Sequence, residues 1–241
     1  MSARPRPRAP HGPATRFQRL DPSSHTYASV SATLALAVIA LLSTGCDLIG
    51  RSGAGPVKGE TREAKAFTKI DVSGGINVNV SIGPLKPLEV SAQENILPLI
   101  ATDVEGDTLR IHSTGSYTSS ATVLVTIVTP SLSAVTSSGG SAVAIVGLQA
   151  DTLDLNMSGG SGVTAKGTVQ TLTIGASGGA RFTLGELAAN GVTVDISGGA
   201  NGTVQASATL TGSASGGANL TVLGNAAVTV STSGGAEVTH G

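Results

Sequence analysis

One serine of the chain stands in a pattern that can do chemistry. The stretch from Gly175 to Gly179 has the spacing G-x-S-x-G, in which a serine on a strand-to-helix turn is the nucleophile of a hydrolase. Such a serine needs a histidine and an acid beside it. The tripeptide Ser-Gly-Gly recurs at six places between residues 138 and 235, and no helix pattern follows Ser177. We therefore expect Ser177 to be a turn residue and the protein not to be an enzyme.

Metal sites are the next chemistry to consider. The segment 159–167, GGSGVTAKG, resembles the calcium-binding nonapeptide of β-rolls, but Thr164 stands where that repeat needs an aspartate. A zinc site has little to bind to, because the chain has a single cysteine and its histidines are scattered. We expect no metal and no cofactor. We expect Asp151, Asp154 and Asp195 to be solvated outward residues and His112 to be an ordinary strand residue. The other histidines are His240 and the pair His11 and His25, which lie in or before the predicted export signal.

The single cysteine, Cys46, is interpreted as a site of lipid attachment. A leader rich in Arg and Pro over residues 1–27 precedes an apolar run over 28–42, which is shorter than the roughly 20 residues of a membrane-spanning helix. A basic region, a short apolar run and small residues are typical of a signal peptide. Ser43-Thr44-Gly45-Cys46 resembles the bacterial lipobox, with Ser43 where Leu is usual. The alternatives are an uncleaved anchor or an ordinary signal peptide followed by a chance cysteine.

These features divide the chain into three predicted parts. We expect a signal peptide over residues 1–45, a lipidated Cys46 with a flexible tether over 46–65, and one β-domain over 66–241. The tether is predicted from its Gly, Ser, Pro and charged residues, which leave little to bury. We expect the mature protein to be held by its lipid in the cell envelope, on the periplasmic face or the cell surface.

The composition constrains both the core and the partners. The net charge of −1 gives no electrostatic basis for nucleic-acid binding. Only 12% of residues are charged and 2% are aromatic, so the core must be built from Val, Leu, Ile and Ala in thin layers.

A repeated tripeptide organises the second half of the chain. Ser-Gly-Gly begins at six serines separated by 20, 19, 20, 18 and 18 residues. The glycines allow the positive φ or tight bend of a turn. The predicted structural turns are Ser138, Gly139, Gly140, Ser158, Gly159, Gly160, Ser177, Gly178, Gly179, Ser197, Gly198, Gly199, Ser215, Gly216, Gly217, Ser233, Gly234 and Gly235.

Apolar and polar residues alternate on both sides of each turn. Leu153 and Leu155 precede Ser158 with Asp154 between them, and later copies repeat this pattern, although Gly212 interrupts one of them. Period-two alternation is typical of a strand with one buried face. We expect the outward positions to form a binding surface. They hold Thr173, Thr193, Thr211, Thr229, Thr164, Thr183, Thr203 and Thr221.

One copy cannot bury its own apolar side, so successive copies must stack. The sequence therefore predicts an all-β fold, a right-handed parallel β-helix (solenoid) with coils of 18–20 residues cornered by Ser-Gly-Gly. Neighbouring coils would lie about 4.8 Å apart. The last coil would leave an unpaired edge, which Glu237 and His240 blunt or a partner subunit covers, so a homo-oligomer is one expectation.

The first half of the chain also has short alternating strand segments, but they are less regularly spaced. Strands are predicted over 76–83, 87–92, 108–113 and 121–128, and a short helix or an irregular bend over 94–104. Ser73-Gly74-Gly75 is a seventh copy of the tripeptide. We expect degenerate coils up to about residue 137 and regular repeats over 138–241.

The order of these segments resembles a known family. FTKIDVSGGINVNVSIG, LEVSAQENI, DTLRIHS and VTIVTPSLSAVTSSGGSAV, followed by iterated SGGA coils, resemble the head GIN domain over residues 66–241. The resemblance implies a β-helical fold, an extracytoplasmic location and an adhesin role, and it carries no catalytic residues.

Three functions follow as hypotheses. The first is a non-catalytic envelope lipoprotein that binds a glycan, a cell-wall polymer or a protein through its outward faces. The second is a polysaccharide-active β-helix enzyme, which the shortage of aromatic residues and clustered carboxylates disfavours. The third is an envelope-associated signalling accessory.

Overall fold

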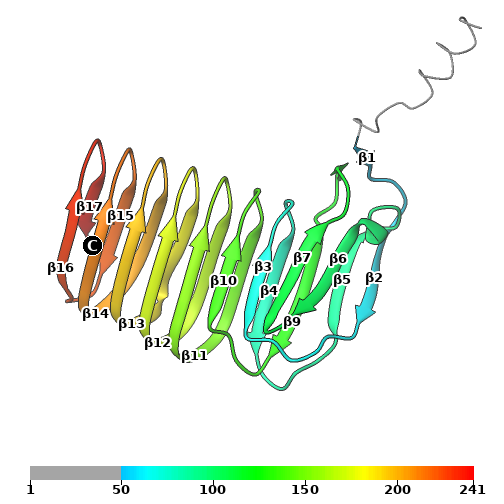
Figure 1. Ribbon diagram of the computed structural model, residues 1–241, viewed down its shortest axis with the longest axis horizontal. Helices are drawn as coiled ribbons and strands as arrows, with labels where there is room; N and C mark the ends of the chain where they lie inside the picture. Colours follow the sequence, from blue (N-terminus) through cyan, green and yellow to red (C-terminus); the bar gives the residue numbers. More distant parts are fainter. Residues whose placement is uncertain (1–49) are drawn as a thin grey trace, which may run out of the picture. The chain divides into compact units, whose positions relative to one another are not determined.

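The computed structural model describes residues 50–241 as a nearly all-β solenoid of stacked parallel coils (Figure 1). This confirms the predicted fold class. The predicted signal peptide and Cys46 lie outside the described residues. No helix among residues 50–241 is long and apolar enough to cross a membrane.

The regular coils form the C-terminal stack, which we define as residues 134–241. Its strands pair in parallel and in chain order from β10 to β14, after which β15 and β16 both lie on β14 and β17 lies on β15. The strands of the stack are β10 (Ala134–Ser137), β11 (Ala142–Met157), β12 (Gly162–Ala176), β13 (Arg181–Ile196), β14 (Asn201–Ala214), β15 (Asn219–Leu223), β16 (Ala227–Thr232) and β17 (Glu237–His240).

Each long strand makes most of one coil. The two short strands expected per copy are continuous in β11 to β14, with a register shift where the coil turns, as between Ile145 and Leu148. The residues before this shift pair in one sheet and the residues after it pair in a second sheet. The two sheets therefore share the long strands, and Ser-Gly-Gly makes the other corner.

The Ser-Gly-Gly corners lie in a row along one edge of the stack. The first glycine of each copy in the stack has a φ between +62° and +71°, which favours glycine. Each later corner also rests on the one before it, since the Gly179 amide donates to the Gly159 carbonyl at 2.8 Å and the Gly199 amide to Gly178 at 2.7 Å. A Cβ on Gly198 would lie 3.1 Å from the backbone N and O of Gly178. Positive φ and close approach together explain why glycine recurs here.

Inward side chains form continuous columns between the two sheets. Leu153, Leu172, Val192 and Leu210 are in register and are all at most 2% exposed. Burying each such side chain contributes about 1.5–3 kcal/mol, so no single coil has to supply a core of its own. In one place two coils compensate each other: a Cβ on Gly202 would overlap the ring of Phe182, which occupies the space that the glycine leaves.

The N-terminal region, residues 51–129, departs from chain order. Strand β3 pairs with both β10 and β7, and β4 pairs with both β11 and β9. The coil of β3 and β4 therefore lies between the stack and strands that come later in the sequence (Figure 1). The strands concerned are β3 (Lys69–Val72), β4 (Asn77–Ile82), β7 (Thr108–Ser113) and β9 (Leu124–Thr129).

Antiparallel strands complete this end of the solenoid. The pairs are β6 with β7, and β5 with both β9 and β2. The segment predicted as a helix or bend is a 3₁₀ turn followed by β6. These elements are β2 (Val57–Arg62), β5 (Leu88–Gln93), the turn η1 (Leu97–Leu99) and β6 (Ile100–Glu105).

The prediction of a flexible tether over residues 46–65 is wrong for part of that segment. Residues 57–62 form β2, and a two-residue strand β1 (Arg51–Ser52) pairs with β8 (Tyr117–Thr118). The side chain of Arg62 explains why a polar segment is held: it donates to the carbonyls of Leu97 and Ile100 and is 18% exposed. A charged side chain that hydrogen-bonds to backbone replaces the apolar burial that the tether lacks.

The last coil is open on its outer side. Strands β16 and β17 each pair with one described strand, and the inward Val228, Val230 and Val238 are only partly buried. Glu237 and His240, which we expected to blunt this edge, both lie exposed on β17.

Candidate functional site

The predicted threonine surface forms ladders on both sheets. Thr173, Thr193, Thr211 and Thr229 are in register on one sheet and are all exposed. On the other sheet the ladder runs in register through Thr164, Thr183, Thr203 and Thr221, of which the last two are half-buried. The ladders therefore lie on two different faces, and their role in binding stays a prediction.

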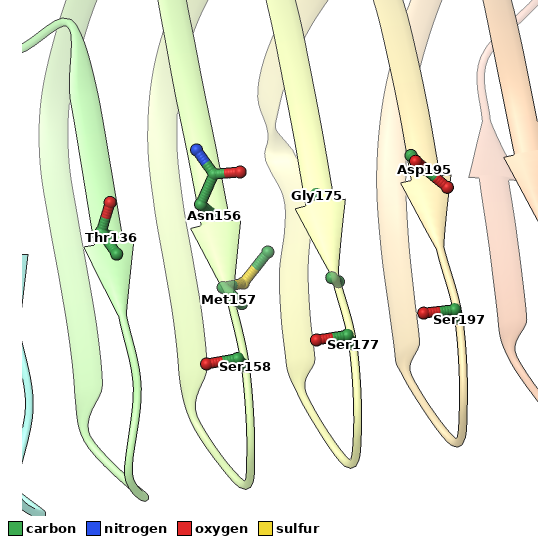
Figure 2. A pocket seen from close by; sticks show the side chains of 9 residues that line it. Thr136, Asn156, Met157, Ser158, Gly175, Ser177, Asp195 and Ser197 are labelled. Atoms are coloured by element: carbon green, nitrogen blue, oxygen red, sulfur yellow. The ribbon is translucent and has the colours of Figure 1, made fainter.

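The serines of the corners also line up. Ser158, Ser177 and Ser197 occupy the same place in successive coils, and Figure 2 shows their side chains pointing the same way. Ser177 is followed by a turn and then by strand β13, so the helix that a nucleophile elbow requires does not follow it. Ser177 is thus one of a series of serines in equivalent places at the corners.

A notch interrupts the outward column next to these serines. Two residues before each corner serine, the coils carry side chains in register at Thr136, Asn156, Asp195 and Ser213, but Gly175 stands between Asn156 and Asp195. The missing side chain leaves a hollow of about 350 Å³. We call it the Gly175 notch (Figure 2), and its lining residues are Thr136, Asn156, Met157, Ser158, Gly175, Ala176, Ser177, Asp195 and Ser197.

The polar groups around the Gly175 notch are largely free to bind. The Ser213 hydroxyl donates to Asp195 Oδ1 at 2.8 Å, which leaves Oδ2 available. Hydrogen bonds within residues 50–241 leave the Asn156 amide and the hydroxyls of Ser158, Ser177 and Ser197 unused. The notch therefore offers one carboxylate oxygen, one carboxamide and three hydroxyls, which together can both donate and accept.

Sequence reasoning missed the Gly175 notch, although a signal was present. The six copies read Thr, Asn, Gly, Asp, Ser and Ser at this position, so one glycine stands among outward polar residues. Alternation of apolar and polar residues marks this position as outward but does not distinguish one copy from the next.

Other hollows lie elsewhere on the described part of the solenoid, and two of them lie on the sheets of the stack. One of about 580 Å³ lies where the chain enters β10, and there the amide and hydroxyl of Ser133 both donate to the Thr68 carbonyl. Another of about 280 Å³ lies on the other sheet, where Ala142, Ala144 and Gly162 carry little or no side chain. The first is polar as well, since Gln149, Asp151 and Gln170 are among its lining residues, whereas the second is mainly apolar.

The described residues contain no group of three or more His, Cys, Asp or Glu side chains that could hold a metal ion.

Two buried or half-buried side chains of the N-terminal region have distinctive surroundings. The Tyr117 hydroxyl donates to the Gly74 carbonyl at 3.0 Å, and burial raises the pKa of this phenol. Nδ1 of His112 is buried and has no hydrogen-bond partner among these residues.

A family model matches most of the described chain. Residues 66–226 match the family described as "Putative auto-transporter adhesin, head GIN domain". No curated protein matches the chain.

Solved structures share the fold at low sequence identity. A putative adhesin from Bacteroides fragilis has a TM-score of 0.62 at 20% identity, covering 79% of this chain and 100% of its own. A putative adhesin from Parabacteroides merdae has a TM-score of 0.56 at 17% identity, covering 79% and 98%. A putative lipid binding protein from Parabacteroides distasonis has a TM-score of 0.51 at 16% identity, with the same coverage.

Proposed function

Because the chain belongs to the head GIN domain family of putative auto-transporter adhesins, we propose that it is a non-catalytic binding module of the cell envelope. The observation that carries this proposal is the regular outward surface of the C-terminal stack. Its sheets present in-register columns of short hydroxyl and amide side chains over a core that is fully buried. Extended solenoid surfaces of this kind commonly serve as binding platforms.

Side-chain hydrogen bonds within these columns support a rigid platform. Asn219 donates to the Asn201 side chain at 2.9 Å, and the hydroxyls of Thr221 and Thr239 lie 3.4 Å apart. Side chains that are already ordered lose less entropy when a ligand binds. A preorganised surface suits adhesion, in which many weak contacts act together.

We place this module at the membrane through lipid attached to Cys46. In this proposal residues 1–45 are removed as a signal peptide, and the segment that follows Cys46 is held to the domain by β1 and β2. Radiolabelled palmitate should be incorporated into the protein in cells, and the variant Cys46→Ala should lose the label and leave the membrane fraction. Label retained by Cys46→Ala would overturn the anchor.

The adhesin role is tested with the full chain in detergent. Its binding to immobilised glycans, cell-wall polymer and whole cells is measured beside a reducing-end assay for glycan cleavage. We expect binding without cleavage. Release of new reducing ends would show a polysaccharide-active enzyme, and absence of binding to every surface would overturn the adhesin role.

A further inference from the structure

We propose that the Gly175 notch is a subsite for one neutral sugar unit of a glycan. The inference rests on the proposed binding function and assigns a place and a ligand class to it. Three properties of the notch lead to it: its width, its mixed hydrogen-bonding groups and its uniqueness in the column.

The width of the notch suits one small ring. Asn156, Gly175 and Asp195 are in register on three successive strands. Strands lie about 4.8 Å apart, so the two flanking residues are separated by about 10 Å across the glycine. The exposed Asn156 side chain leans toward the glycine, with Oδ1 2.7 Å from the place of the missing Cβ, so a pyranose ring would lie against this amide oxygen and beside Asp195. The volume of about 350 Å³ is at the small end of ligand clefts, which suits a single unit.

The chemistry of the notch favours hydroxyl groups over other ligands. A sugar hydroxyl both donates and accepts, and it is met here by a carboxylate oxygen of Asp195, the amide of Asn156 and the corner hydroxyls. A phosphate would be repelled by Asp195, and a calcium ion would require several more carboxylate or carbonyl oxygens.

The notch occurs once in its column, so a single molecule should bind weakly. The groups are exposed, so each hydrogen bond to the ligand replaces one to water, and immobilising the ligand offsets much of what is gained. We expect dissociation constants of about 1 mM for a monosaccharide. Many copies at a cell surface would raise the apparent affinity by multivalency.

The test fills the notch without disturbing the strand. Gly175→Thr restores a β-branched side chain to an outward position where neighbouring coils carry Thr, Asn and Asp, and the φ of Gly175 is not in the left-handed region. A Cβ there would lie 2.7 Å from Oδ1 of Asn156, an exposed side chain that can rotate. The matched control is Gly191→Thr, since Gly191 lies on the same sheet outside the notch and its Cβ would make an ordinary 3.5 Å contact with Thr209.

The probes are polymers bearing multiple copies of glucose, galactose, mannose or N-acetylglucosamine, offered to the full chain in detergent. We expect at least one to bind the wild type and Gly191→Thr equally, and Gly175→Thr at least tenfold more weakly. Asp195→Asn and Asn156→Ala, which leave the notch open, should each weaken the same binding and thus provide a readout should Gly175→Thr not fold.

Two results would overturn the subsite. One is equal binding of the same sugar by Gly175→Thr and Gly191→Thr, and the other is the absence of binding by the wild type to any of the four sugars. Adhesion of the wild type to cells or to a protein surface in either case would leave the proposed function standing while removing the Gly175 notch from it.

Discussion

The C-terminal stack and the N-terminal region reach a β-solenoid by different means. In the stack every described strand pairing is parallel, and each coil lies on the coil before it in sequence. In the N-terminal region the coil of β3 and β4 is enclosed by later strands, and β2, β5 and β6 pair antiparallel. The stack repeats the same coil-on-coil pairing, whereas each contact of the N-terminal region occurs once.

The ion pairs also differ between the two regions. Of the ion pairs among residues 50–241, only that between Lys166 and Glu186 lies in the stack, and the others join strands or turns of the N-terminal region. A repeating core needs no charges to set its register, because columns of like residues already do so. The irregular end depends on individually placed polar contacts, so the two regions should respond differently to substitution.

The largest loss of stability is expected where the ring of Phe182 fills the space beside Gly202 of the next coil. Phe182→Ala should lower the free energy of unfolding by about 3–5 kcal/mol, because a large buried ring is lost. Gly202→Val should cost about 1–3 kcal/mol or more through overpacking against the same ring. Unfolding in urea followed by circular dichroism measures both.

The double variant decides whether the two positions are coupled. Phe182→Val with Gly202→Val gives both coils the β-branched residue that Val163 has in this column. Its loss of stability should be smaller, by more than 1 kcal/mol, than the sum of the losses measured for the single variants Phe182→Val and Gly202→Val. Additive losses would mean that the ring does not fill the space above Gly202.

The corner glycines provide the next comparison. Gly198→Ala combines a positive φ with a 3.1 Å approach to the backbone of Gly178, and should cost about 3 kcal/mol. Gly74, the equivalent glycine of the first corner, has a φ of +85° but room for a Cβ, since its nearest contact would be 3.6 Å. Gly74→Ala should therefore cost only the conformational strain, about 1–2 kcal/mol. Equal losses in urea unfolding would show that the stacking of corners adds nothing.

The stack could be predicted in detail from the sequence, because residues at the same distance from each corner serine lie next to one another in neighbouring coils. Aligning the copies on their serines places Leu153 with Leu172 and Thr173 with Thr193, and these are the observed register pairs. It could not predict the order of coils in the N-terminal region. The corner at Ser73 lies under the corner at Ser138, 65 residues later, and the intervening segments lack the tripeptide that would mark their place.

The candidate site was partly predictable for the same reason. The columns of outward threonines follow from alternation, so their exposure could be anticipated. The Gly175 notch depends on what stands on both sides of a residue in neighbouring coils, which becomes visible only when the register is known. The tether over 57–62 was mispredicted because its stability depends on the side chain of Arg62 reaching η1 and β6, and no local pattern reveals such a contact.

Arg62 tests the individually placed contacts of the N-terminal region. Arg62→Ala removes hydrogen bonds to the carbonyls of Leu97 and Ile100 and should cost about 3 kcal/mol, the low end for two hydrogen bonds of about 1.5–3 kcal/mol each to a charged group. Hydrogen exchange should become faster in β2 and β6 and stay unchanged in β12 and β13. Arg181→Ala, at an exposed position on β13, is the control and should have no effect. Faster exchange throughout the chain would contradict the separation of the two regions.

The smallest effect is expected from acid, and it should begin at the N-terminal region. The hydrogen bond from Lys69 holds the pKa of Asp107 below its ordinary value, and Arg62 does the same for the pKa of Glu60. A depressed folded-state pKa gives stability that is complete above the unfolded-state pKa, about 4, and is lost as pH falls through the folded value. Both carboxylates are exposed, so solvent screens the gain and the loss is small. Hydrogen exchange corrected for its intrinsic pH dependence should show β6 and β7 losing protection between pH 5 and pH 3 before β12 and β13 do, and Asp107→Asn should reduce that loss. Simultaneous loss in both regions would mean that these ion pairs do not hold the irregular end of the solenoid.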